Sequence, residues 1–475
     1  MAESTQAGPT RLRPWQTARR LWLSLQNPLE ALPAAAYRAP LLQTRLLHRH
    51  LVHVMDPALI QQALAGHAAG LDKGETVRRP LTPALGEGLL TAEGAHWRWQ
   101  RQALAPLFRP DRVQALLAPM LAAAEQARDR LAATTQPVAI EQATIRTTFD
   151  IILATMLPGS RIDAAAMAQG VNDYVRQTNW SLVLVMLGLP DWTPHPGRGR
   201  ARRAVRRMRG QVSAHVAARR GGEGTPRAEP DLLDQLLSAQ DPETGRAMTD
   251  AEVTDNLLTF LTAGHETTAL SLAWTLDLIA RHPEVQARAA AEIHAVTGGA
   301  PVAARHLAGL DYLRCVIQEG MRLYPPVPMI ARSVREAFTL GGTDVPAGAT
   351  LVVPIAAVHR HTTLWTDPDR FDPGRFMPEA AAGRHRYAFL PFGAGPRVCI
   401  GSGFAMLEAT AILAVLLQAL RFEAALPVPP AARMDLTLRP VAPLLLRVTR
   451  APSSSPGAPP ASRSSSRHPR PAMSR

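Results

Sequence analysis

A single helical run from about Thr249 to Arg281 is the feature that most constrains the fold of this chain. At about 1.5 Å per residue it would be about 45 Å long, enough to cross a whole domain. Other alanine- and leucine-rich segments repeat apolar residues at the helical period, at 111–134, 161–189, 200–220, 284–297, 306–322 and 402–420. Strand signals are fewer, at 46–55 and 337–355, where Gly341-Gly342 is typical of a hairpin turn. The pattern predicts a single large domain that is mainly α with a minor β sheet.

The two cysteines, Cys315 and Cys399, limit the chemistry that is open to the chain. They are too few for a disulfide-rich secreted scaffold, for a four-cysteine zinc site or for an iron–sulfur cluster held by four thiolates. A length of 475 residues with 46% hydrophobic residues excludes a disordered chain. Any thiolate chemistry therefore depends on one of these two cysteines acting alone.

The net charge of +13 is carried almost entirely by arginine, because Lys73 is the only lysine. Such a charge concerns solubility and association and not the fold, so we interpret it as a solvated basic surface with a basic tail. A nucleic-acid partner is not expected. Nucleic-acid surfaces combine clustered charge with aromatic side chains, and only 5% of the residues here are aromatic.

The two ends of the chain differ from its middle. We expect an N-terminal segment at 1–39, a folded domain at 40–450 and a disordered tail at 451–475 that is rich in Ser, Pro and Arg. The start lacks the apolar stretch of a secretory signal, and no run reaches about 18 uncharged apolar residues, so we expect a cytoplasmic protein without a transmembrane anchor. Residues 11–25 have a basic amphipathic pattern, which either packs on the domain or contacts a membrane surface.

The segment from Phe392 to Gly401 reads FGAGPRVCIG and directly precedes an apolar helical stretch. Cys399 is therefore at or just before a helix N-terminus, where free N–H groups and the helix dipole favour a thiolate. The glycines let the backbone approach a flat group closely, Phe392 would shield the sulfur, and Arg397 would place a cation beside it. These features favour a thiolate that ligates a metal in a dry pocket. A lone cysteine is more often a small buried hydrophobe, which is our interpretation of Cys315.

This segment resembles the heme-binding loop of the cytochrome P-450 family, and the chain is identified as a member of that family, of the soluble bacterial type. The resemblance implies a heme domain that covers nearly the whole folded chain. It implies heme b as the cofactor and Cys399 as the proximal ligand of the iron. It also implies that Phe392, Arg397 and Gly401 belong to the heme-binding loop.

A second motif, in the middle of the long helical run, reads AGHETT from Ala263 to Thr268. Glycine and threonine are unfavourable there, and the Thr267 hydroxyl can donate to the Ala263 carbonyl, so we expect a local widening of the helix. The resemblance implies that Ala263 and Gly264 line the groove that holds dioxygen, the co-substrate. It also implies that Glu266 is the acid and Thr267 the alcohol that relay protons.

A third motif places Glu319 and Arg322 three residues apart on a predicted helix, a pair that is common and worth little when it is exposed. With Arg375 they resemble the buried structural network of the family, which holds the region of the cysteine loop. One departure is Gly374, which stands where the family often has glutamate. That departure concerns the loop and not the arginine.

A fourth set of residues resembles the family's site for the heme propionates. Trp97 and Arg101 are four residues apart and would face the same way on a helix. Arg332 and Arg397 match its other propionate-binding positions, and the forked donors of arginine suit carboxylates. The alternative for each arginine is that it is an ordinary surface residue that binds no propionate.

The implied activity is that of a heme-thiolate monooxygenase, which inserts one oxygen atom from O2 into an apolar organic substrate by hydroxylation or epoxidation. The length leaves no room for a flavin or ferredoxin domain, so the electrons would come from separate proteins, a ferredoxin with its reductase or a flavodoxin. The substrate itself is not readable from the sequence. Candidate substrate-lining residues are Phe260, Val327, Met329 and Ile330.

Several alternatives stay open at this point. A peroxide-driven peroxygenase and a non-redox isomerase can use the same scaffold, but both are expected to lack the pair Glu266 and Thr267. A heme-thiolate gas sensor or carrier is disfavoured by the same pair, though less strongly. A zinc hydrolase or a thiol protease is not supported, because neither the ligand set nor a cysteine–histidine constellation is evident.

Overall fold

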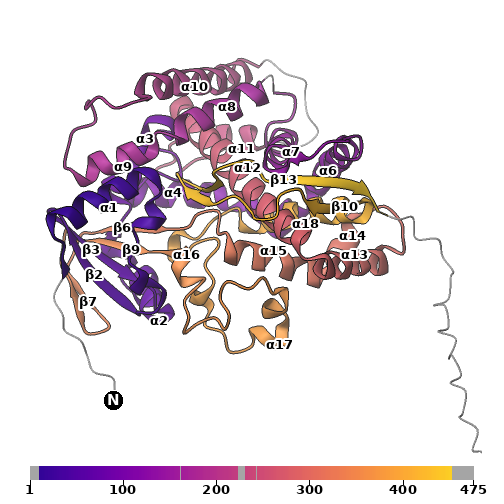
Figure 1. Ribbon diagram of the computed structural model, residues 1–475. Coiled ribbons are helices and arrows are strands. Elements are labelled where there is room, and N and C mark those ends of the chain that lie inside the picture. Colours follow the sequence, from indigo (N-terminus) through magenta and orange to yellow (C-terminus); the bar gives the residue numbers. More distant parts are fainter. Residues whose placement is uncertain (1–9, 161, 223–230, 242, 452–475) are drawn as a thin grey trace, which may run out of the picture.

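The computed structural model describes residues 10–160, 162–222, 231–241 and 243–451. Most of this part of the chain is helical. The helices pack around the long helix α12 (Asp250–Arg281), and the largest sheet lies at one side of the molecule (Figure 1). The predicted tail, from residue 452 onward, and the first nine residues lie outside the described residues.

The helices agree with the segments predicted from the apolar period. The predicted segment 111–134 divides into α5 and α6, 161–189 into α8 and α9, and 306–322 into α14 and α15. Besides α12, the helices are α1 (Pro14–Gln26), α2 (Pro57–Gln61), α3 (Gly74–Leu85), α4 (Gly94–Leu104), α5 (Pro110–Ala115), α6 (Leu117–Ala132), α7 (Ile140–Met156), α8 (Ala164–Val175), α9 (Thr178–Met186), α10 (Arg198–Arg220), α11 (Leu232–Ser238), α13 (Pro283–Thr297), α14 (Ala304–Leu307), α15 (Asp311–Leu323), α16 (Ile355–Val358), α17 (Pro378–Ala381) and α18 (Ser402–Ala419).

The strands form one six-stranded sheet in the order β1-β2-β3-β9-β6-β4, a three-stranded sheet β10-β13-β5, and the hairpins β7–β8 and β11–β12. The predicted turn at Gly341-Gly342 joins β7 and β8, but the strand expected at 46–55 is two strands, of which the first ends at Leu46. The strands are β1 (Thr10–Arg11), β2 (Leu41–Leu46), β3 (Arg49–Val54), β4 (Leu71–Asp72), β5 (Val138–Ala139), β6 (Ile330–Val334), β7 (Phe338–Leu340), β8 (Thr343–Val345), β9 (Thr350–Val353), β10 (Leu420–Ala424), β11 (Ala432–Met434), β12 (Leu438–Pro440) and β13 (Leu445–Arg450).

Helix α12 crosses the core, as its length predicts. It begins at a capping box, in which the Thr249 hydroxyl accepts from the Glu252 N–H at 3.3 Å and the Glu252 carboxylate accepts from the Thr249 N–H at 2.9 Å. Most of its side chains are buried, in a large apolar cluster shared with α6, α7, α15 and α18. A smaller cluster lies under the six-stranded sheet. Because α12 is buried on all sides, its residues are placed inside the protein and not on its surface.

Helix α18 follows the cysteine loop directly. Of the helices in the described residues, it is the one with the length and apolar composition to cross a bilayer, and most of that stretch is buried inside the protein. It packs against α6, α13 and α15. Burial in this core accounts for its composition.

Candidate active site

The loop before α18 holds Cys399 in a tight turn. The Cys399 N–H donates to the Phe392 carbonyl at 2.9 Å, and the Val398 N–H donates to the Gly395 carbonyl at 3.1 Å. Gly395 has a φ of +69°, and a Cβ there would collide with the Leu64 carbonyl oxygen, so glycine is required. The turn leads straight into α18, which agrees with the predicted position of the cysteine at a helix N-terminus.

The Cys399 thiol is accessible although it lies deep among protein atoms. Burial raises its pKa, while a hydrogen bond from the Gly401 backbone and the charge of Arg101 act in the opposite direction. The ring of Phe108 lies near Gly401, where a Cβ would be 3.6 Å away, and its centroid is 5.6 Å from that of Phe260 on α12. Phe108 therefore links the start of α18 to α12.

Trp97, Arg101 and Arg397 meet beside the cysteine loop. The guanidinium carbon of Arg397 lies 3.9 Å from the centroid of the Trp97 ring. Arg101 Nη1 donates to the Val398 carbonyl at 2.8 Å, and Arg397 Nη1 donates to the Ala92 carbonyl at 2.8 Å. The structure thus brings Arg397 to the neighbouring pair Trp97 and Arg101, from which it is almost 300 residues away in the sequence.

Lys73 and Glu93 lie in the same cluster, although the sequence analysis gave neither of them a role. Lys73 is 6% exposed, its backbone N–H donates to Glu93 Oε1 at 2.9 Å, and its Nζ donates to the Leu90 carbonyl. Burial, together with the nearby charges of Arg332 and Arg397, lowers the pKa of Lys73 from 10.5 to about 7, while the charge of Glu93 acts in the opposite direction. Glu93 also forms an ion pair with Arg397. The sole signal in the sequence is that this is the one lysine of an arginine-rich chain.

This cluster has a surplus of positive charge. Three basic side chains, Lys73, Arg332 and Arg397, lie around one carboxylate, that of Glu93, which leaves two positive charges without a partner when all three are protonated. The second acid nearby, Asp72, is already paired with an arginine at 2.7 Å. Buried charges of one sign are costly unless an anion accompanies them. The two propionates of a heme supply two negative charges, so the donor set fits this group.

Helix α12 carries Ala263, Gly264 and Thr267 in its middle. The Thr267 hydroxyl donates to the Ala263 carbonyl at 2.7 Å, as predicted. The predicted widening is wrong for this structure, because α12 is α-helical without interruption. A carbonyl oxygen accepts two hydrogen bonds, so the hydroxyl adds to the backbone ladder without opening it. Gly264 makes room for α7, since a Cβ there would lie 2.7 Å from Ile152 Cδ1.

Glu266 is buried and held by the hairpin β11–β12. Its Oε1 accepts from the Thr437 hydroxyl at 2.6 Å and from Arg439 Nε at 2.6 Å. Arg439 Nη1 in turn donates to Asn172 Oδ1 of α8 at 2.5 Å. These donors hold the carboxylate at one oxygen, between α12, α8 and the hairpin. These partners could not be predicted from the sequence, because they lie more than 170 residues away from Glu266 along the chain.

Glu319, Arg322 and Arg375 come together as the resemblance implies. Glu319 and Arg322 are fully buried, and Arg322 Nε lies 2.6 Å from Glu319 Oε2. Arg375 Nε lies 3.5 Å from Glu319 Oε1, which also accepts from the Asp372 N–H at 2.9 Å. Arg322 further donates to the carbonyls of His359, Pro368 and Arg370. The network ties α15 to the irregular segment that leads to the cysteine loop.

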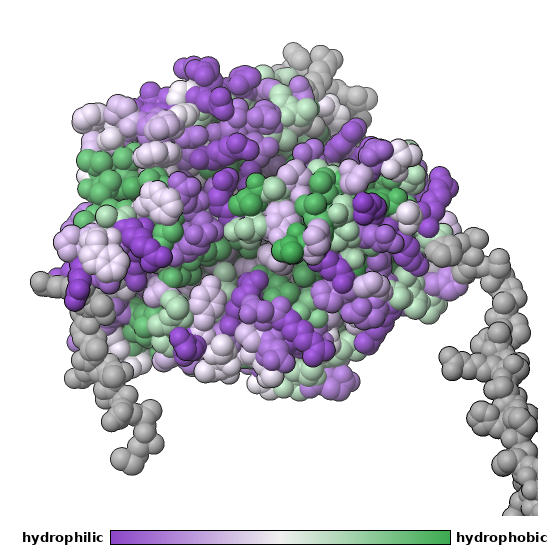
Figure 2. Space-filling model, in the orientation of Figure 1, coloured by the Kyte–Doolittle hydropathy of each residue, from purple (hydrophilic) through white to green (hydrophobic). Residues whose placement is uncertain are grey.

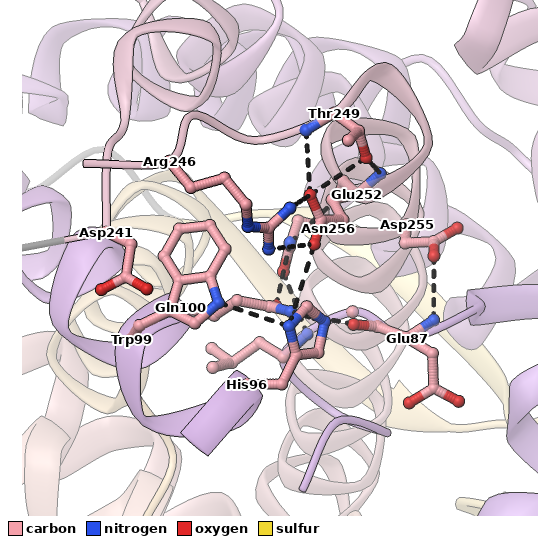
Figure 3. Close-up of polar contacts among 12 residues, drawn as sticks. Glu87, His96, Trp99, Gln100, Asp241, Arg246, Thr249, Glu252, Asp255 and Asn256 are labelled. Carbon is pink, nitrogen blue, oxygen red and sulfur yellow. Dashed lines mark hydrogen bonds and ion pairs between the residues drawn. The ribbon is translucent and has the colours of Figure 1, made fainter. Parts of the chain in front are cut away.

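A second polar network joins α4 to the start of α12 (Figure 3). Arg246 donates to both carboxylate oxygens of Glu252 at 2.7 and 3.0 Å, and His96 lies 3.8 Å from Glu252. Gln100 Oε1 accepts from Asn256 Nδ2 at 3.0 Å. This network was not predicted from the sequence. It fixes α4, which carries Trp97 and Arg101, against α12, which carries Glu266 and Thr267.

The four candidate substrate-lining residues differ in their burial and in how close they lie to the site. Phe260 is buried on α12 against the Phe108 ring. Ile330, the first residue of β6, lies beside the cysteine loop, because a Cβ at Gly393 would be 3.4 Å from Ile330 Cδ1. Met329 is half-buried, and Val327 is 37% exposed. Phe260 and Ile330 therefore border the site, whereas Val327 is partly exposed to solvent.

Known proteins match almost the whole chain. The family model described as cytochrome P-450 matches residues 21–446. Cyclooctat-9-en-7-ol 5-monooxygenase of Streptomyces melanosporofaciens is 33% identical over 403 residues, which cover 83% of this chain and 84% of the relative. Cyclooctatin synthase of the same organism is 31% identical over 88% of this chain and 91% of the relative. A crystal structure of the cytochrome P450DA heme domain superposes with a TM-score of 0.76 at 27% identity, covering 87% of this chain and 90% of that chain.

Animal proteins match as well. Cytochrome P-450 4V2 of Mus musculus is 33% identical over 71% of this chain and 69% of the relative. The comparisons therefore support the family but do not distinguish a soluble bacterial type. The family match agrees with the accessible cysteine before α18 and with the charge of the cluster beside it. The chain belongs to the cytochrome P-450 family and is a heme-thiolate monooxygenase, an oxidoreductase that uses O2, an organic substrate and electrons from a redox partner.

Proposed function

We propose that the substrate is an apolar unsaturated alcohol of the kind that the name of one relative describes, cyclooctat-9-en-7-ol. The single observation that supports this class is the 33% identity to the enzyme that is named for this compound. The apolar side chains of Phe260 and Ile330 beside the site suit an apolar ring system. Their roles would be to bind and orient the substrate and to exclude water.

We infer the residues that hold the heme from the geometry beside the cysteine loop. When bound, the heme supplies the activation of dioxygen and the transfer of one oxygen atom. Cys399 would ligate the iron, and Phe392 and Gly401 would shape the loop around the sulfur. The residues that would surround the propionates are Lys73, Trp97, Arg101, Arg332 and Arg397.

The contribution of the chain's own side chains to the reaction would be proton transfer. The Thr267 hydroxyl donates its hydrogen to the Ala263 carbonyl, so its oxygen is left as an acceptor for a further proton donor. Glu266 is clamped by Arg439 and can pass a proton when that contact loosens. We infer that Glu266 and Thr267 relay protons and that Arg439 positions the acid.

The relay predicts that Thr267→Ala uncouples electron consumption from product formation. General acid–base contributions are about 100-fold or more, so we expect the yield of product per electron pair to fall at least about tenfold, with peroxide as the by-product. The matched control is Thr259→Ala, because Thr259 lies on the same helix and makes the same bond, at 2.8 Å, to the carbonyl four residues back. Product, peroxide and reductant consumption are measured with a peroxide scavenger present. Unchanged coupling in Thr267→Ala would contradict the relay.

The charge surplus predicts that Lys73→Met weakens heme retention. A hydrogen bond to a charged group contributes about 1.5–3 kcal/mol, so heme should transfer to apomyoglobin about tenfold to a hundredfold faster than from the unaltered protein. Arg220→Met is the matched control, since Arg220 is exposed and its ion pair with Asp250 joins the end of α10 to the start of α12. Equal heme-transfer rates for both variants would contradict the assignment of Lys73 to the propionate site.

We also propose that the electron donor is a ferredoxin or a flavodoxin that docks beside the cysteine loop. Four arginines of this region are exposed, namely Arg98, Arg109, Arg112 and Arg386, whereas Arg384 is half-buried over the ring of Trp365. Charge of this sign suits an acidic redox protein. The near absence of lysine and the two relatives from Streptomyces favour a bacterial source, and we expect the enzyme in the cytoplasm with a peripheral membrane contact.

A further inference from the structure

A cavity of about 340 Å³ lies beside α17, in the segment that leads to the cysteine loop. The residues that line it are Leu364, Trp365, Thr366, Arg375, Ala380 and Arg384. Thr366 and Ala380 are exposed, so the cavity is open to solvent. No residue of the heme, substrate or proton-transfer sites lines this cavity, so the monooxygenase reaction does not account for it.

Arg384 is held at the cavity by two aromatic rings. Its guanidinium carbon lies 4.6 Å from the centroid of the Trp365 ring and 4.9 Å from that of the Phe376 ring. Its Nη2 donates to the Arg375 carbonyl, a bond that uses one of the five N–H donors of a guanidinium. Within the described residues, no carboxylate forms an ion pair with Arg384. The side chain is therefore fixed in position while most of its donors stay open to a ligand.

Three arginines share a single carboxylate beside this cavity. Arg322 Nε and Nη2 donate to the two oxygens of Glu319 at 2.6 and 2.8 Å, and Arg375 Nε lies 3.5 Å from Glu319 Oε1. Burial lowers the pKa of Arg384, and among the nearby charges Glu319 raises this pKa whereas the other two arginines lower it. Arginine stays protonated in proteins, so the cluster carries two positive charges without a matching negative charge. These charges repel one another, and an anion from solution would relieve the repulsion.

The neighbouring aspartates are engaged elsewhere. The Asp372 carboxylate accepts from the backbone N–H two residues later at 3.0 Å, and the Asp369 carboxylate pairs with another arginine at 3.2 Å. Asp367 contacts Arg375 through its backbone carbonyl, at 2.9 Å, and not through its carboxylate. The two surplus charges are therefore available to an anion that enters the cavity.

The surface around the cavity suits a small polar ligand. Figure 1 shows α17 at the lower edge of the molecule, on the opposite side from α10. The space-filling view in the same orientation (Figure 2) shows hydrophilic side chains beside weakly hydrophobic ones at this edge, without a broad and strongly hydrophobic patch. Sites that dock a protein or a membrane usually present such a patch.

We propose that this cavity binds a doubly charged oxyanion of the phosphate class, either inorganic phosphate or the phosphate group of a small ester. Two negative charges match the surplus of the cluster, and the forked donors of Arg384 and Arg375 suit the oxygens of a phosphate. The Thr366 hydroxyl lines the same cavity and is a further donor. A bound phosphate would bridge Arg375 and Arg384 and so stabilise the segment that leads to Cys399. The site is independent of the assignment of the catalytic residues.

The test is calorimetric titration of the holoenzyme with sodium phosphate and with glycerol 3-phosphate, at an ionic strength held constant with sodium chloride. Arg384→Met removes the donor, and Ala380→Glu places a carboxylate at an exposed position of the cavity wall without removing a contact of the cluster. Arg386→Met is the matched control, because Arg386 also lies over an aromatic ring, that of Tyr387 at 5.1 Å, but does not line the cavity. The melting temperature and heme content without phosphate check that each variant folds.

We expect saturable binding of one phosphate by the unaltered protein and by the control, with a rise in melting temperature. Arg384→Met and Ala380→Glu should each bind about tenfold more weakly or worse, the loss expected for one charge-assisted hydrogen bond. Binding of phosphate alone would identify the ligand as the free ion, whereas binding of glycerol 3-phosphate as well would identify the phosphate group of an ester. No saturable binding of either compound by the unaltered protein would overturn the proposal, as would equal affinities in all three variants.

Discussion

Cys399→Ala is expected to lose the thiolate ligand and, with it, monooxygenase turnover down to the rate without enzyme. No second described thiol can replace it. Cys315 is buried on α15, with its Sγ 3.7 Å from Met377 Sδ, and burial raises its pKa. The variant should keep its fold, because Cys399 is accessible and the bond from its backbone to Phe392 does not need the side chain. Turnover with a competent electron donor and heme content per chain are measured.

Cys315→Ala is the control for this experiment. It removes the other thiol of the chain but leaves the cysteine loop intact, so turnover and heme content should stay close to those of the unaltered protein. The cavity it leaves is small and should cost about 1 kcal/mol of stability. If Cys315→Ala lost turnover while Cys399→Ala kept it, the two cysteines would have been assigned in the wrong order.

Glu319→Ala has the second largest expected effect. It leaves the fully buried guanidinium of Arg322 without its carboxylate and removes an acceptor for the Asp372 N–H. Breaking a buried ion pair costs about 3–5 kcal/mol, a large part of the stability of a folded protein. Because Arg322 also holds the carbonyls of the segment before the cysteine loop, the variant should lose heme as well. Denaturant unfolding and heme content measure both effects.

Asp311→Ala is the matched control for Glu319→Ala. Asp311 forms an ion pair with Arg314 on the same helix at the same spacing of three residues, but its side chain is 72% exposed. Exposed pairs contribute about 1 kcal/mol or less, so this variant should be close to the unaltered protein. The double variant Glu319→Met/Arg322→Met should be less destabilised than Glu319→Ala, because it leaves no unpaired charge. Similar losses in all three variants would contradict a special role for the buried pair.

The sequence predicted the parts of the fold that depend on local pattern. The long run ending at Arg281 became α12, and the glycine pair at 341–342 became a hairpin turn. Apolar periods and turn residues act over a few positions, so a single sequence reveals them. Short strands such as β4 and β5 have two residues each and exist through their partners, which no local pattern contains.

The site was predictable where its residues stand in compact motifs. Cys399 precedes its helix, and Thr267 bonds Ala263 as its position suggests. The partners of Glu266 were not predictable, because the chain must fold before Arg439 lies within 2.6 Å of the carboxylate. The expected widening of α12 was wrong, since the hydroxyl uses a free lone pair of the carbonyl.

Lys73 shows what composition can and cannot reveal. Its uniqueness is visible in the sequence, but its position beside Glu93 and the two arginines depends on contacts between separate segments.

The absorption spectrum of the reduced, CO-bound holoenzyme tests the central claim most directly, because it reports the iron ligand without any knowledge of the substrate. The account predicts the red-shifted Soret band of a thiolate-ligated heme in the unaltered protein and in Cys315→Ala, and its absence in Cys399→Ala. A band typical of histidine ligation in the unaltered protein would contradict the account. A red-shifted band that persists in Cys399→Ala would contradict it too.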